Sequence, residues 1–113
     1  MMTKEEIARE WSYHSWRDEF DDEAKRILIE LDGAEILFAE YERGGYEGDA
    51  AVIFRKDGRV FETYGGHCSC FGLEGQWQPE ETTIEAILMR KHIHGTQRDA
   101  RTAIQALRDA GKI

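Results

Sequence analysis

A tight turn near the middle of the chain restricts the fold more than any other feature of the sequence. Lys56-Asp57-Gly58 separates two short apolar runs, AAVIFR and RVFETY, and an Asp-Gly pair between such runs is typical of a β-hairpin. A third segment with roughly alternating apolar residues is joined to this hairpin by the glycine-rich residues 44–49. We therefore expect three antiparallel strands, at residues 35–42, 50–55 and 59–64.

Segments with helical periodicity lie on both sides of these strands in the sequence. Typical cap and stop residues mark their ends: Thr3 for the first helix, Thr82 or Thr83 for the third, and Gly111 after the last. The four predicted helices span about residues 3–20, 21–32, 82–92 and 96–110. In the third helix we expect four side chains to face inward: Ile84, Ile87, Leu88 and Met89. The order α-α-β-β-β-α-α indicates one α+β domain over residues 1–113, with a short three-stranded antiparallel sheet flanked by about four helices.

The first predicted helix carries aromatic side chains on two nearly opposite faces. One face holds Ile7, Trp11 and His14, and the other holds Tyr13, Trp16 and Phe20. The helix is packed on two sides, breaks near residues 12–15, or exposes one aromatic face to a partner. Of these three interpretations we favour burial on two sides.

Acidic residues are concentrated in the first half of the chain. The net charge is −8, and residues 1–49 carry 15 acids and 6 bases, whereas residues 82–113 carry 3 acids and 6 bases. This acidity argues against direct nucleic-acid binding and suits a basic protein partner. The alternative is a solvated face that only favours solubility. The densest acidic block, which we predict to bind a partner, is Glu19, Asp21, Asp22 and Glu23.

The sharpest local signal is His67-Cys68-Ser69-Cys70, inside the glycine-rich residues 65–81, which we expect to form a long loop. With His92 and His94, these thiols and imidazoles form a potential Cys₂His₂ zinc site. The spacing argues against it, because one residue separates the cysteines, whereas structural zinc sites usually have two to four. The alternative is that the cysteines are small buried apolar residues and the histidines lie at the surface.

A thiol enzyme is a further alternative, because a cysteine nucleophile needs a base such as His14, His67 or His92. No catalytic cysteine signature matches GGHCSCFG. We therefore predict no catalytic residues and no cofactor apart from the zinc of the preceding hypothesis.

The sequence also bears on location. The N-terminal MMTKEEIAREW has acids where a signal peptide needs an apolar stretch, and no apolar run is long enough to span a membrane. A disulfide between Cys68 and Cys70 would be strained, so an oxidising compartment is not indicated. We expect a cytoplasmic protein. The sequence leaves its oligomeric state open.

The stretch YGGHCSCFGLEGQWQPEE at residues 64–81 resembles a signature of small acidic bacteriophage and prophage proteins, mostly of unassigned function. The similarity extends to the preceding hairpin from Tyr46. It implies a viral accessory protein in the host bacterial cytoplasm that binds and can inhibit a host protein such as a defence nuclease or part of the transcription machinery. The leading hypothesis is therefore a non-enzymatic protein-binding domain that acts through its acidic surface.

Overall fold

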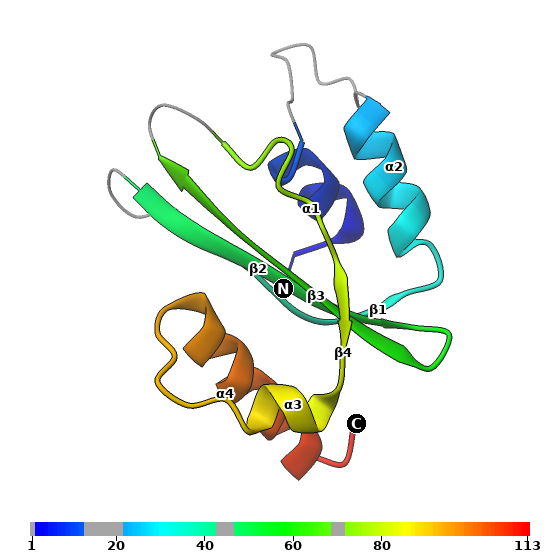
Figure 1. Ribbon diagram of the computed structural model, residues 1–113. Helices are drawn as coiled ribbons and strands as arrows, with labels where there is room; N and C mark the ends of the chain where they lie inside the picture. The colour runs from blue at the N-terminus through cyan, green and yellow to red at the C-terminus, as the bar shows by residue number, and fades with distance from the viewer. Residues whose placement is uncertain (1, 13–21, 43–46, 69–71) are drawn as a thin grey trace.

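The computed structural model describes residues 2–12, 22–42, 47–68 and 72–113. Its elements in chain order are α1 (Lys4–Glu10), α2 (Asp22–Leu31), β1 (Glu35–Tyr41), β2 (Glu47–Lys56), β3 (Arg59–Cys68), β4 (Glu80–Thr82), α3 (Ile84–Leu88) and α4 (Thr96–Asp109). The α+β class is confirmed (Figure 1). The predicted number of strands is wrong, because the sheet has four strands where we expected three.

The sheet is an antiparallel meander in the order β1-β2-β3-β4. The three predicted strands are present, but β2 and β3 extend to Glu47 and Cys68, so residues 65–68 belong to a strand and not to the predicted loop. The missed strand β4 pairs with residues 60–62 of β3. Its residues, Glu80, Glu81 and Thr82, show no apolar alternation, so only contact with β3 identifies them as a strand.

The central hairpin forms as predicted. Asp57 and Gly58 have φ values of 54° and 76°, the left-handed conformation that a two-residue type I′ turn requires at both positions. The turn fixes the register, so Phe54 lies opposite Phe61 and the two rings stack at 5.3 Å. Local turn chemistry therefore positions the two longest strands.

Helices cover both faces of the sheet, with α1 and α2 on one side and α3 and α4 on the other (Figure 1). The apolar run of β2 is buried on both sides: Ala50, Val52 and Phe54 join the core under α1 and α2, while Ala51 and Ile53 join the core under α4. All five are at most 2% exposed. Continuous apolar runs are typical of strands covered on both faces, and β2 is accordingly the central support of the fold.

The first predicted helix is shorter than expected. Thr3 is its N-cap, in a capping box with Glu6, and α1 ends at Glu10 with Trp11 as the C-cap. Ile7 and Trp11 are fully buried, as expected for one of the two aromatic faces. The other face falls on residues 13–21, outside the described residues.

The third predicted helix is also shorter. Thr83 caps it as predicted, but α3 ends at Leu88 and not near His92, which has a φ of 57°. Met89, expected to face inward, is 75% exposed because the helix has ended before it. Gly111, with a φ of 72°, follows the end of α4 as predicted.

Candidate functional site

Part of the distinctive motif at residues 64–81 completes the edge of the sheet. The side-chain amide of Gln76 accepts a hydrogen bond from the Gly66 N–H at 2.9 Å and donates one to the Gly66 carbonyl at 2.8 Å. A neighbouring strand would satisfy the same pair of backbone groups. Gln76 thus takes the place of a strand where β4 does not reach.

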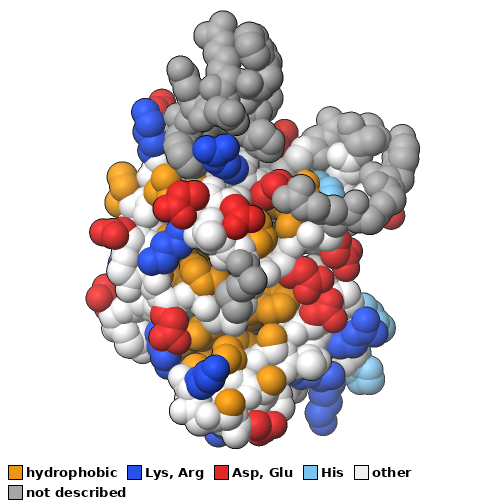
Figure 2. Space-filling model, turned by 180° about the vertical axis from the view of Figure 1, so that it is seen from behind, with side chains coloured by type: hydrophobic (Ala, Val, Ile, Leu, Met, Phe, Trp, Pro, Cys, Tyr) orange, Lys and Arg blue, Asp and Glu red, His pale blue; other side chains and the backbone are white. Residues whose placement is uncertain are grey.

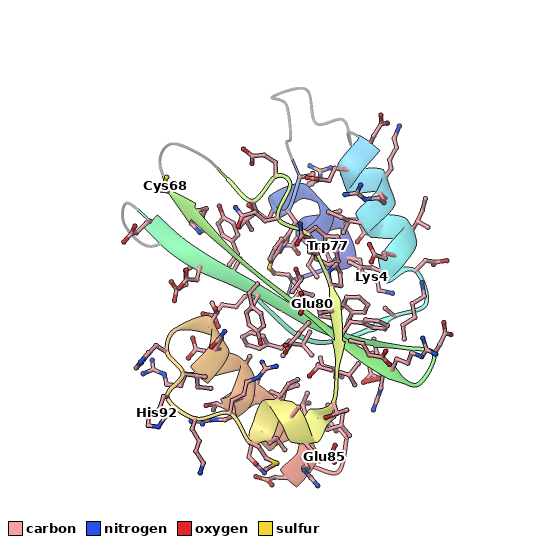
Figure 3. All side chains as sticks on the ribbon, viewed as in Figure 1. Lys4, Cys68, Trp77, Glu80, Glu85 and His92 are labelled. Atoms are coloured by element: carbon pink, nitrogen blue, oxygen red, sulfur yellow. The ribbon has the colours of Figure 1, made fainter. Side chains whose placement is uncertain are left out.

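Trp77 anchors the same segment to the layer of α1 and α2. Its ring packs edge-on against Trp11 at 5.4 Å and stacks with Phe54 at 6.2 Å. Its indole N–H donates to Glu30 of α2 at 2.9 Å. Trp77 is 5% exposed, so this motif residue is part of the core (Figure 3).

The predicted partner-binding block is only partly described. Glu19 and Asp21 lie outside the described residues, and Asp22 is exposed in the first turn of α2. Both Glu23 carboxylate oxygens accept from the Gly75 N–H at 3.1 Å. Glu23 therefore also holds the motif segment against α2, a structural role that the sequence pattern did not indicate.

The predicted zinc ligands are spread over the fold. His67 and Cys68 are consecutive in β3, so their side chains point to opposite faces. His92 and His94 are exposed on the connection between α3 and α4, and His92 lies well apart from Cys68 (Figure 3). Within the described residues no three of these ligand atoms come close enough to hold one ion. Cys70 lies outside the described residues, so the zinc hypothesis stays a prediction.

We expect zinc occupancy not to depend on the exposed His92. A native mass spectrum of protein purified without chelator should show the same metal content for wild type and for His92→Asn, because His92 lies well apart from Cys68. One zinc per chain in wild type that is lost in this variant would contradict the prediction and support the Cys₂His₂ set. Cys68→Ser/Cys70→Ser is the matched test of the thiols.

His67 lies in an unusual environment for a surface histidine. Its ring stacks in parallel on Tyr41 at 4.3 Å, and its buried Nε2 atom has no hydrogen-bond partner among the described residues. A methyl group at Gly48, the residue opposite it on β2, would lie 2.9 Å from that nitrogen. Because Cys68 points to the other face of β3, this arrangement does not support a thiolate–imidazole pair.

An open hollow of about 790 Å³ lies at this end of the sheet. Three of its eight lining residues are acids. The hollow is lined by Glu42, Glu47, Gly48, Asp49, Gly66, His67, Cys68 and Gln76. These carboxylates give the hollow a negative charge that suits a basic partner.

The most concentrated chemistry is an acidic face at the ends of β1 and β2. We use this name for five residues, Glu40, Glu42, Glu47, Asp49 and Asp99. Along the strands, these acids alternate with residues whose side chains point to the opposite face of the sheet. Asp99 comes from the first turn of α4. One carboxylate oxygen each from Glu40, Glu42 and Asp99 lies within 4.8 Å of the other two. Figure 2 shows acidic side chains grouped beside histidine and basic side chains on one flank of the molecule.

The electrostatics of the acidic face follow from this crowding. Burial, a hydrogen bond to Asp99 and the charges of Asp99 and Glu42 raise the pKa of Glu40 to about 7. Among the described residues, the cation within ion-pair distance of the carboxylate cluster is Arg98, whose Nε lies 3.9 Å from Asp99 and whose side chain is 63% exposed. The described part of the face therefore keeps an excess of negative charge.

The sequence pattern had pointed to a different set of acids, the block at residues 19–23. In both pairs, Glu40-x-Glu42 and Glu47-x-Asp49, the acids are two residues apart, the spacing that places strand side chains on one face. This spacing was visible in the sequence on both sides of the connection between the first two strands. Asp99 gave no such signal, because only the docking of α4 on β1 and β2 brings it there.

The chain matches no protein-family model, no curated protein and no solved structure. Among the described residues, the structure contains no helix long and apolar enough to cross a membrane. The functional argument therefore rests on the geometry and charge of the acidic face.

Proposed function

We propose that this chain is a non-catalytic, phage-derived accessory protein that acts in the host bacterial cytoplasm by binding a basic surface of a host protein. The observation that carries the proposal is the acidic face, where Glu40, Glu42 and Asp99 each place a carboxylate oxygen within 4.8 Å of the other two, with Arg98 as the nearby cation among the described residues. Because the fold holds like charges close together, a basic surface of a partner would relieve the repulsion between them. Complementary charge also speeds the encounter.

The class of partner follows from the same charge. Proteins that handle nucleic acid carry lysine and arginine patches that contact phosphates, and an acidic face can occupy such a patch. The resemblance of residues 64–81 to small phage proteins favours a host defence or nucleic-acid-handling factor, whose activity the bound protein would inhibit.

A pair of matched charge reversals tests the proposal. Glu47→Lys/Asp49→Lys changes two exposed positions of the acidic face, and Asp22→Lys/Asp32→Lys changes two exposed acids outside it by the same amount of charge. After the partner has been captured from a bacterial lysate, identified and purified, its affinity should fall at least about tenfold for the first variant, since several ion pairs are lost. The second variant should bind like wild type.

Salt provides an independent measurement on the same complex. We expect the affinity of the wild-type protein to weaken as NaCl rises from about 50 to about 500 mM, because salt screens charges that lie near the surface. Equal loss of affinity in both double variants would show a nonspecific charge effect and contradict the proposal. An affinity that neither salt nor the Glu47/Asp49 variant changes would also contradict it.

A further inference from the structure

Three carboxylates meet where α4 docks on the edge strand. Glu40 belongs to β1, Glu42 follows it directly after the strand, and Asp99 is in the first turn of α4. One carboxylate oxygen of each lies within 4.8 Å of the other two, and all three residues are half-buried. Carboxylates this close and partly removed from water do not all ionise at the usual pH, because each charge opposes the next. One of them is expected to keep its proton near neutral pH.

Most of the charged groups around Glu40 are acids. Glu42 follows just after the end of β1, and across the sheet Glu40 faces Ala51, with Asp49 the nearby acid on β2. From α4 it faces Asp99, whose ion pair with Arg98 at 3.9 Å is long and exposed. The imidazoles of His67 and His94 line the neighbouring hollows, with Glu42 and Asp49 respectively.

We infer that Glu40 keeps its proton and donates it to Asp99, and that this carboxyl–carboxylate hydrogen bond is a pH-dependent latch between β1 and the first turn of α4. Loss of the proton turns this hydrogen bond into a repulsion between two carboxylates. The first turn of α4 then separates from β1, while the buried Ala100 and Ile104 hold the remaining helix on the sheet. The inference rests on the carboxylate geometry and does not depend on the proposed partner.

The direction of the pH effect follows from proton binding. The pKa of Glu40 is about 7 in the folded chain, against 4.5 for an ordinary glutamate. The folded state therefore holds a proton between these values that the unfolded state has released. The contribution of this proton to the free energy of unfolding is fully present below about pH 4.5. It decreases as the pH rises to about 7 and is absent above that range.

Direct titration is the first test. The side-chain carboxyl carbon of Glu40, followed by ¹³C NMR in the wild-type protein, should titrate with a midpoint near 7. A midpoint near the ordinary value of 4.5 would overturn the inference, and this test needs no variant.

Stability measurements test the latch itself. The control variant Glu40→Gln cannot titrate, but its amide keeps a hydrogen-bond donor toward Asp99. From pH 5 to 7 the unfolding equilibrium constant of wild type, divided by that of Glu40→Gln, should rise by up to about tenfold per pH unit. Glu47→Gln removes one charge from the same face without touching the Glu40 proton and should keep the wild-type slope. Parallel pH profiles for wild type and Glu40→Gln would overturn the inference.

Hydrogen exchange locates the effect. The Asp99 amide donates to the Gly95 carbonyl at 3.0 Å in the first turn of α4. Its protection, corrected for the intrinsic pH dependence of exchange, should fall between pH 6 and 8, while that of Ile104 stays constant. Unchanged protection at Asp99 would show that no latch opens.

Discussion

Replacing Trp77 by alanine should destabilise the protein by about 3–5 kcal/mol, as expected for removing a large buried aromatic side chain. Trp77 is 5% exposed and contacts both Trp11 and Phe54, so its loss leaves a cavity between residues 72–78 and the layer of α1 and α2. The cavity cannot close easily, because Trp11 and Phe54 are themselves fixed in the core. Urea denaturation followed by circular dichroism measures the change in free energy of unfolding.

Trp77→Phe separates packing from hydrogen bonding. It keeps an aromatic ring but removes the N–H that donates to Glu30 at 2.9 Å. We expect a loss of about 1–3 kcal/mol, because a partly buried carboxylate then lacks its donor. If Trp77→Ala cost less than about 1 kcal/mol, residues 72–78 would not be docked on the core as the structure shows.

Gly65→Ala should destabilise the protein by about 1–3 kcal/mol, although Gly66→Ala next to it should change stability by less than about 1 kcal/mol. The two glycines are consecutive in β3 and differ in what lies above them. A methyl group at Gly65 would lie 2.9 Å from Gln76 Oε1, 3.0 Å from Leu73 Cδ2 and 3.1 Å from Trp11 Cζ3. At Gly66 the closest atom would be 3.7 Å away, an ordinary contact.

Thermal and urea unfolding of the two alanine variants provide the comparison, since both substitutions have the same effect on the entropy of the unfolded chain. A similar loss in both would mean that glycine is needed for the backbone of β3 and not for the close approach of Trp11 and Gln76. If neither variant lost stability, residues 72–78 would be able to move away from Gly65 at little cost.

The acidic block and the acidic face show how far charge patterns can be interpreted. The sequence indicated correctly that acids gather in the first half of the chain, and four of the five acidic-face residues lie there. It did not indicate which of them share a surface. Glu23 belongs to the densest acidic run but binds the Gly75 N–H, whereas Asp99 comes from the basic end of the chain and joins Glu40 and Glu42.

Short-range interactions determined what the sequence could predict by itself. The type I′ turn at Asp57-Gly58, the capping box of Thr3 and Glu6, and the cap at Thr83 each depend on residues at most a few positions apart. The apolar run of β2 likewise determined its burial. These features are local, and they were enough to predict the α+β class and the central hairpin.

Only the tertiary structure decided the features that join distant residues. β4 is a strand because β3 offers it backbone partners, and Gln76 completes that edge by bonding Gly66. The same long-range packing separates His92 from Cys68 and brings Asp99 to Glu40. Such contacts depend on how α4 and residues 72–78 dock on the sheet, and that docking is decided by the shape and burial of the whole core, which no local pattern encodes.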